Sequence, residues 1–215
     1  MNADTFIRDN SQLLAPPLVP EIRLHLASEV IPLWRKTEEE LAKIGVPPPY
    51  WAFAWAGGQA LARYVLDHPD IVLGKRVLDF GAGSGLVALA AAKAGAAHVI
   101  AADIDPFAVA AIARNATVNG FVVETVSGDV IGETEMFDLI LVGDMCYERP
   151  LAERLMAWLK SSAAQVLLGD PGRSYFPKTG LTQLASYSVP TSRELEDREI
   201  RETGVWRLDR KRDRD

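Results

Sequence analysis

The stretch Gly143–Glu148, GDMCYE, is the part of the sequence whose residue types best suit chemistry. It follows FDLILV, an apolar run that indicates a buried strand. A carboxylate at the end of a central strand packs poorly, because burying a charge is costly unless it is paired. It is a good group for holding a substrate, so we take Asp144 and its neighbour Tyr147 as candidate catalytic residues. Cys146 is better explained as a buried thiol than as a nucleophile.

A glycine-rich turn, DFGAGSGL, offers a second kind of chemistry. Glycines at 81, 83 and 85 allow a tight turn and bring bare backbone against a ligand. A dinucleotide turn of the G-x-G-x-x-G type would need its third glycine at position 86, where this chain has Leu86. The turn is instead D-x-G-x-G-x-G, with Asp79 two residues before the first glycine. This spacing disfavours NAD as the ligand.

Two further acids follow the next predicted strands. Asp103, in AADID, lies about 20 residues past the turn, where an acid is expected to bind a ribose. One carboxylate can accept hydrogen bonds from both ribose hydroxyls. Asp129 stands in SGD after the third strand, whereas Asp105 suits the N-cap of a helix. Any one of these acids could simply cap a turn, but their spacing along successive strands predicts a nucleoside site.

Alternating strands and helices must position these residues. Apolar runs predict strands over 76–80, 98–103, 122–127, 137–142 and 164–169. Helices are predicted between them, over 84–95 with Ser84 as N-cap and Gly95 as stop, over 105–120 with Pro106 in the first turn, and over 151–160. This alternation predicts a doubly wound α/β sheet of parallel strands. Two strand-like runs, 182–190 and 198–208, have no helix between them and predict an antiparallel edge.

We expect a single domain over residues 1–215. Residues 1–60 form an N-terminal helical or irregular extension, marked by prolines and by an exposed helix over 34–45, and a helix from Trp55 to Leu66 leads into the core. Residues 61–215 form the α/β core. The single cysteine excludes an internal disulfide, and the three histidines have no metal-ligand spacing, so no metal is predicted.

The composition places the chain among ordinary globular proteins. It is 48% hydrophobic and 24% charged, with a net charge of -6, which argues against a protein that grips nucleic acid. The start lacks an apolar signal core, and no apolar run is long enough to span a membrane. We therefore expect a cytoplasmic protein that binds neither membrane nor nucleic acid.

The whole chain resembles the electron transfer flavoprotein beta-subunit lysine methyltransferases, within the class I S-adenosylmethionine-dependent methyltransferases. The matching segments are PEIRL, PPYWAFAWAGGQALARYVLD, VLDFGAGSG, DIDP, GDMCYE, LLGDPGR and GVW. The resemblance implies a Rossmann-like seven-stranded sheet with an antiparallel edge strand and S-adenosyl-L-methionine as cofactor. It places Asp79 near the methionine amino group, the glycine backbone near the nucleoside, Asp103 at the ribose and Asp129 at the adenine amino group. Trp55 is assigned to the cofactor site, whereas Trp51 is expected to pack the N-terminal segment.

The resemblance also implies a lysine acceptor, because D-x-x-Y here lacks the prolines of the D/N-P-P-Y motif of amide and adenine methyltransferases. Deprotonating a lysine with a pKa near 10.4 costs roughly 4.6 kcal/mol at pH 7. A carboxylate beside the amine favours its charged form, so Asp144 would bind and orient the amine rather than act as the base. Tyr147 would form an aromatic wall. Arg173, in GDPGR, is expected to fix a substrate-side loop.

Three functions remain open from the sequence. The first is methylation of a protein lysine, with the electron transfer flavoprotein beta subunit or a ribosomal protein as substrate. The second is N-methylation of a small molecule such as nicotinamide, which would need an enclosed pocket. The third is a non-catalytic binding module of the same fold, against which the intact glycine turn, Asp103 and Asp144 argue.

Overall fold

A computed structural model describes residues 2–27, 47–133, 136–191 and 199–209, and it contains a sheet in the strand order β5-β4-β3-β6-β7-β9-β8. The strands are β3 (Arg76–Phe80), β4 (His98–Asp103), β5 (Glu124–Ser127), β6 (Leu139–Gly143), β7 (Gln165–Asp170), β8 (Leu181–Pro190) and β9 (Ile200–Leu208). The first five are parallel to one another, and β9 runs antiparallel to both β7 and β8. The predicted doubly wound sheet with an antiparallel edge is confirmed.

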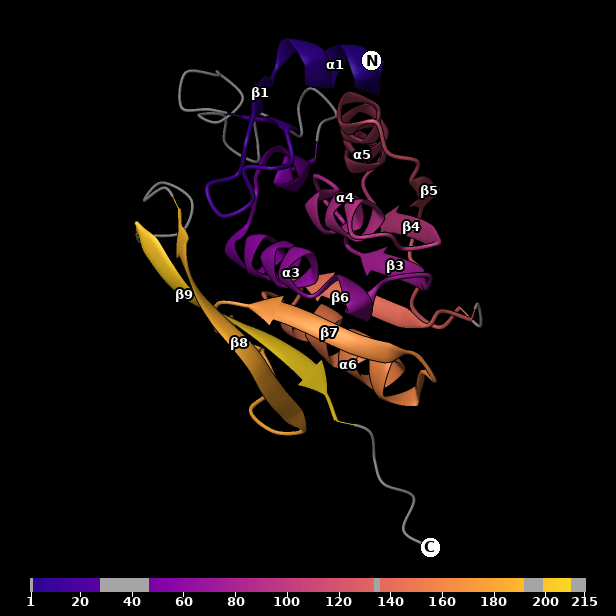
Figure 1. The fold of residues 1–215 in the computed structure, drawn as a ribbon, viewed down its shortest axis with the longest axis vertical. Coiled ribbons are helices and arrows are strands. Elements are labelled where there is room, and N and C mark those ends of the chain that lie inside the picture. Colours follow the sequence, from indigo (N-terminus) through magenta and orange to yellow (C-terminus); the bar gives the residue numbers. More distant parts are fainter. Residues whose placement is uncertain (1, 28–46, 134–135, 192–198, 210–215) are drawn as a thin grey trace, which may run out of the picture.

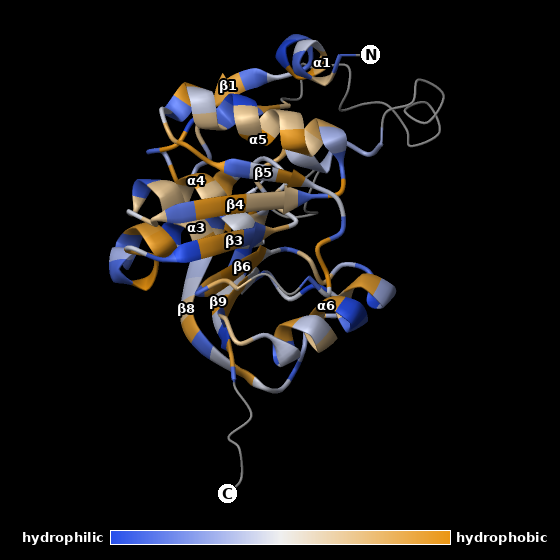
Figure 2. Cartoon of the chain, turned by 90° about the vertical axis from the view of Figure 1, so that its right-hand side faces the viewer, coloured by the Kyte–Doolittle hydropathy of each residue, from blue (hydrophilic) through white to orange (hydrophobic). Residues whose placement is uncertain are grey.

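The helices cover both faces of this sheet, which is why its central strands are continuous apolar runs. They are α3 (Ala56–Asp67), α4 (Leu86–Lys93), α5 (Pro106–Asn119) and α6 (Arg149–Ser161). Side chains such as Val77 and Leu141 pack with α3, α4 and α5, whereas Leu78 and Ile140 pack with α6 on the opposite face. Figures 1 and 2 show α6 on the side of the sheet away from α3.

The N-terminal segment has more regular structure than the sequence indicated. It contains helix α1 (Ala3–Asp9), the antiparallel pair β1 (Gln12–Leu14) and β2 (Leu24–Leu26), and a short 3-10 turn, η2 (Tyr50–Ala52). Trp51 is buried beside Phe6, Ile7 and Phe107, as the packing interpretation predicted. The helix predicted over 34–45 lies outside the described residues, and the proposed boundary at residue 60 falls inside α3.

Helix ends show where local signals were sufficient. α5 begins as predicted, with the Asp105 side chain accepting a hydrogen bond from the Phe107 N–H, and it ends at Gly120. The predicted N-cap of α4 was wrong. Gly85, with a φ of 81°, occupies the cap position, and the Ser84 carbonyl instead accepts a hydrogen bond from the Asn115 amide. The glycine turn continues one residue further than expected, so the helix starts later.

The antiparallel edge is formed by two long strands, β8 and β9. β9 lies between β7 and β8, and the antiparallel pair of β8 and β9 stands at one edge of the sheet (Figure 1). A short 3-10 helix, η3 (Pro69–Ile71), lies between α3 and β3, at the end of the sheet where the parallel strands begin. Within the described ranges, none of the helices is both long and apolar enough to cross a bilayer.

Candidate active site

The chain order of the strands marks one place in the sheet as a ligand site. From β3 the chain moves outward through β4 to β5, and then returns to place β6 on the other side of β3. In open α/β sheets, ligands bind at the carboxyl ends of the strands where this reversal occurs. The glycine turn follows β3, Asp103 ends β4, and the GDMCYE stretch follows β6, so the predicted residues converge at this edge.

The glycine turn leaves bare backbone at one position. All three of its glycines have positive φ, from 53° to 81°. A side chain at Gly81 would clash with Met145, and one at Gly85 would lie 3.2 Å from Ile112. At Gly83 the nearest atom to such a side chain would be the Tyr50 carbonyl oxygen, 3.9 Å away. Gly81 and Gly85 are therefore fixed by packing, whereas the Gly83 backbone is open to a ligand.

Asp103 ties this turn to the end of β4. Its carboxylate accepts hydrogen bonds from the Gly83 N–H at 2.9 Å and from the Asp105 N–H at 2.9 Å. Burial raises the pKa of Asp103, and these backbone hydrogen bonds partly oppose that rise. Because a carboxylate offers about four acceptor positions, the two bonds leave capacity for hydroxyl donors.

Asp79 is buried under the turn with a single described donor. It is 2% exposed and accepts a hydrogen bond from the Ala88 N–H at 2.8 Å. Burial raises its pKa to about 8, with a further rise from the Asp103 charge and an opposing effect of the Ala88 bond. A cationic ligand group nearby would favour its ionised form. Such a carboxyl fits the amino group of an amino-acid ligand.

Asp129 occupies a more exposed position than the other two acids. It accepts a hydrogen bond from the Ile131 N–H at 3.0 Å and forms an ion pair with Arg154 at 2.6 Å. The arginine is the main cause that lowers the pKa of Asp129. These contacts are those expected if Asp129 only caps a turn. Its contact with the adenine amino group stays a prediction.

Asp144 is held by partners on two other elements. It is buried and has a φ of 58°, a left-handed conformation that few residues other than glycine adopt. Its Oδ2 accepts from the N–H groups of Gly57, a short contact, and Gly58, at 3.1 Å, at the start of α3. Its Oδ1 accepts from Arg173 Nε at 2.9 Å and Nη2 at 2.6 Å. Four donors thus occupy the four or so acceptor positions of this carboxylate.

The start of α3 reaches Asp144 because glycines line the contact. A side chain at Gly57 would clash with the Gly169 carbonyl oxygen and lie 2.5 Å from Asp144 Oδ2. A side chain at Gly143 would lie 3.0 Å from the Gly58 Cα. The free N–H groups and positive dipole end of a helix N-terminus then stabilise the carboxylate.

Four aromatic side chains lie near Arg173, the partner of Asp144. We define the aromatic cluster as Tyr50, Phe53, Trp55 and Tyr147. The ring centroids of Tyr50 and Tyr147 are 6.0 Å apart, and Trp55 lies 6.1 Å from Tyr50 and 5.6 Å from Phe53. Tyr50 and Tyr147 are 49% and 41% exposed, so the cluster presents an open aromatic surface. Burial and the neighbouring Tyr50, Glu148 and Asp103 raise the pKa of Tyr147.

Arg173 connects the aromatic cluster to Asp144. Its guanidinium carbon lies 5.8 Å from the centre of the Trp55 ring, within the range of a cation–π contact. The Trp55 indole N–H in turn donates to the Tyr50 carbonyl at 2.9 Å. Trp55 is therefore placed at the cluster, between Arg173 and Tyr50.

Cys146 has no environment that would activate it. The side chain is 1% exposed, and burial, followed by the charges of Asp170 and Asp144, raises its pKa to about 12. The thiol therefore stays protonated at neutral pH. Over the ranges that the structure describes, His, Cys, Asp and Glu side chains form no group of three that could hold a metal ion.

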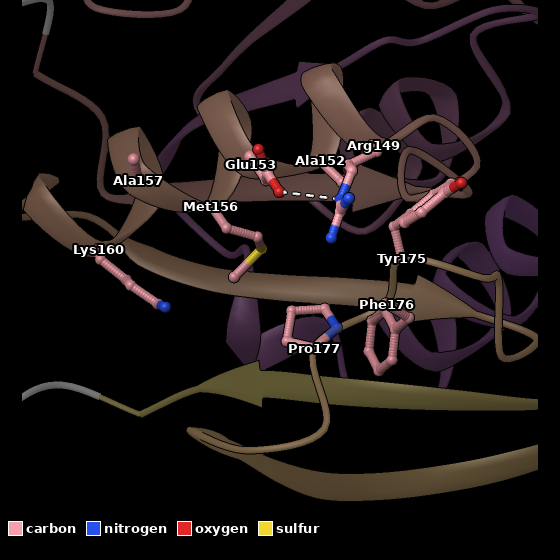
Figure 3. A pocket seen from close by; sticks show the side chains of 9 residues that line it. All are labelled: Arg149, Ala152, Glu153, Met156, Ala157, Lys160, Tyr175, Phe176 and Pro177. Carbon is pink, nitrogen blue, oxygen red and sulfur yellow. Dashed lines mark ion pairs between the residues drawn. The ribbon is translucent and has the colours of Figure 1, made fainter.

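A hollow lies away from these residues, between α6 and the loop that follows β7. It has a volume of about 550 Å³, and Figure 3 shows Met156, Phe176 and Pro177 along it with the Arg149–Glu153 ion pair at one end. The Tyr175 N–H of its rim donates to the Cys146 carbonyl at 3.1 Å. The hollow is open and shares no residue with the glycine turn or the aromatic cluster.

Sequence reasoning missed three contributors to this site. Tyr50 received no role, Arg173 was assigned to a loop without a partner, and the glycine pair 57–58 was not interpreted. The adjacent glycines at the start of a predicted helix were the available signal, since glycine there costs helix stability and indicates a close approach.

The chain is similar to known lysine methyltransferases along nearly its whole length. It is 40% identical over 219 residues to the electron transfer flavoprotein beta subunit lysine methyltransferase of Danio rerio, covering 97% of this chain and 84% of that protein. The Homo sapiens protein of the same name is 36% identical over 212 residues, with 94% and 80% covered. Residues 60–148 match the family described as ribosomal protein L11 methyltransferase.

Solved structures share the fold at lower identity. The ribosomal protein L11 methylase of Lactobacillus delbrueckii subsp. bulgaricus superposes with a TM-score of 0.54 at 22% identity, covering 74% of this chain and 81% of that chain. Magnesium protoporphyrin IX methyltransferase of Synechocystis PCC 6803, with bound SAM, gives a TM-score of 0.53 at 14% identity, covering 71% and 80%. The predicted class I methyltransferase fold is confirmed.

Proposed function

Because the chain belongs to the electron transfer flavoprotein beta subunit lysine methyltransferase family, we propose that it methylates a lysine side chain of that beta subunit, with S-adenosyl-L-methionine as the methyl donor. A ribosomal protein is a second substrate candidate, since residues 60–148 match the L11 methyltransferases. The observation that carries the proposal is the open Gly83 backbone, hydrogen-bonded to Asp103, at the same sheet edge as the exposed ring of Tyr147.

The residues at this edge fit the cofactor group by group. S-adenosylmethionine supplies a methyl group on a positively charged sulfur. The backbone of Gly81, Gly83 and Gly85 would pass along the nucleoside, and Asp103 has acceptor capacity for the ribose hydroxyls. Asp79, buried beneath the turn, would hold the amino group. The proposal retains Asp129 at the adenine amino group and Trp55 beside the cofactor.

The acceptor would approach over the aromatic cluster. The faces of Tyr50 and Tyr147 attract a cationic side chain by of order 0.5–2 kcal/mol and can wall its aliphatic part. Asp144 would hold the amine through its charge in this proposal, since four donors of the chain already occupy its acceptor positions. Alignment of the neutral nitrogen with the methyl group is the main catalytic contribution of the chain. The proton is lost to water before transfer. An exposed cluster accommodates a lysine that projects from a protein surface.

Methyl transfer into purified proteins tests this function. The enzyme is incubated with methyl-labelled S-adenosylmethionine and, in separate reactions, with the flavoprotein beta subunit, ribosomal protein L11 or nicotinamide. Label on a beta-subunit lysine is expected, and it should fall strongly with Asp103→Ala but not with the matched exposed control Asp70→Ala, which lies at the opposite end of the strands. Label on nicotinamide alone, or none at all, would refute the proposal. Fractionation of cells tests the predicted cytoplasmic location.

A further inference from the structure

The Arg173–Asp144 pair changes the electrostatics that the acceptor amine meets. A lysine must lose its proton before its nitrogen can attack, and an isolated carboxylate beside it would oppose this loss. Asp144 is not isolated, because Arg173 donates to its Oδ1 from two nitrogens, at 2.9 and 2.6 Å. Charge-assisted hydrogen bonds of this kind are stronger than those between neutral groups, and here two of them converge on one carboxylate oxygen.

We propose that Arg173 is a positioning residue for methyl transfer, which neutralises Asp144 and so lets the acceptor amine lose its proton to water. This inference rests on the proposed function and goes beyond it by giving the GDPGR loop a role. With the guanidinium present, the pair has no net charge. The amine then meets a polar but neutral site, in which the aromatic walls remain to align it.

The location of Arg173 supports this role. Both side chains are largely buried, at 19% and 9% exposed, so solvent screens their charges poorly. The guanidinium also packs on Trp55, which places it at the aromatic cluster rather than on the outer surface. Asp170 holds its backbone, accepting from the N–H groups of Gly172 and Arg173 at 2.7 Å each.

Other titratable groups lie near the pair or near Tyr147, and three of them are carboxylic acids. Cys146 and Asp170, at the ends of β6 and β7, interact with the pair itself. Tyr50, Glu148 and Asp103 act instead on the neighbouring Tyr147. Arg173 supplies the positive charge within this set. Removing it would therefore leave an acceptor amine beside a carboxylate that has lost its arginine partner.

The pH dependence of a single turnover separates this role from a structural one. The wild type, Arg173→Met, Arg173→Lys and the double variant Asp144→Asn/Arg173→Met are mixed with saturating S-adenosylmethionine and flavoprotein beta subunit between pH 6 and 10. Arg173→Met should move the rising limb of the rate to higher pH by about one unit. Arg173→Lys should leave the limb in place and lower the plateau, and the double variant should return the limb to its wild-type position.

An unmoved limb in Arg173→Met, with the rate reduced equally at all pH values, would overturn the proposal. If Arg173→Met does not fold, the variant Asp144→Asn tests the proposal instead. It leaves the guanidinium of Arg173 without its carboxylate, so the rising limb of the rate should move to lower pH. A limb that stays in place or moves to higher pH would contradict the proposal. Arg149→Met, an exposed arginine on α6, serves as the matched control with an unchanged profile. An inactive wild type would refute the proposed function itself, whereas active variants with identical profiles refute only this inference.

Discussion

The carboxylate of Asp103 accepts a hydrogen bond from the backbone N–H of Gly83 at 2.9 Å, joining the end of β4 to the turn that follows β3. One side chain therefore shapes the glycine turn and, in the proposed function, would also accept hydrogen bonds from the ribose. The turn and its acid form a single unit, which makes Asp103 a sharp point for testing cofactor binding.

Asp103→Ala should weaken S-adenosylmethionine binding by roughly 1.5–3 kcal/mol, or about 10- to 150-fold in dissociation constant, because it removes a charged acceptor. Calorimetric titration measures this change. NAD should show no binding to either protein, and Asp70→Ala should match the wild type. An unchanged constant in Asp103→Ala would show that the residue only caps the turn.

Asp79 should make stability depend on pH. Its pKa in the folded protein is raised from 3.8 to about 8, so between these values the folded state keeps a proton that the unfolded state has lost. The free energy of unfolding should fall as pH rises from about 4 to about 8, by at most ~1.36 kcal/mol per unit. Asp79→Asn should show a shallower fall in urea unfolding series. If the free energy of unfolding falls equally steeply with pH in both proteins, the raised pKa of Asp79 would be contradicted.

Tyr147 should act through its ring. Tyr147→Ala should reduce the methyl-transfer rate by ~100-fold, because the acceptor loses a wall that aligns it, whereas Tyr147→Phe should keep substantial activity. Tyr175→Ala removes a ring of similar exposure, 44%, outside the aromatic cluster and should leave the rate unchanged. Equal losses in Tyr147→Phe and Tyr147→Ala would show that the hydroxyl, not the ring face, is required.

Cys146 should be inert in the folded protein. With a pKa of about 12, only roughly one thiol in 10,000 would be ionised at pH 8, and the side chain is also shielded from reagents. Iodoacetamide should label Cys146 in urea but not under native conditions, as mass spectrometry can measure. Cys146→Ser should retain activity. Rapid native labelling, or a folded Cys146→Ser protein without activity, would contradict this reading of the thiol.

The sequence was sufficient for the sheet because each central strand is an apolar run bounded by a turn signal. The cap at Asp105 was equally clear, since an acid followed by Pro106 satisfies local rules alone. The prediction of Ser84 as the N-cap of α4 was wrong because the preference of serine for N-cap positions competed with the glycine turn. Gly85, which has a positive φ, takes the cap position instead. The short pair β1–β2 was missed because its three-residue strands carry too little periodicity to detect.

The candidate site could be located from the sequence, but the hydrogen-bond partners of its residues could not be predicted. Acids at strand ends in a doubly wound fold must meet at one edge, so Asp79, Asp103 and Asp144 were placed correctly relative to the sheet. The partners of Asp144 lie 86, 87 and 29 residues away, on α3 and on the loop after β7. No local pattern encodes such contacts, because they depend on how closely the glycines let those elements approach.

The place of β9 between β7 and β8 has a consequence for biosynthesis. The ribosome releases β8 before the strand it pairs with, so the emerging chain carries an unmatched β8 and an open β7 edge until residue 208 has left the exit tunnel. Unpaired strand edges are templates for association with other chains. A pause in translation between Pro190 and Leu208 would therefore leave two unpaired strand edges, those of β7 and β8, open to association with other chains. A chaperone that binds the nascent chain would protect it most during that interval.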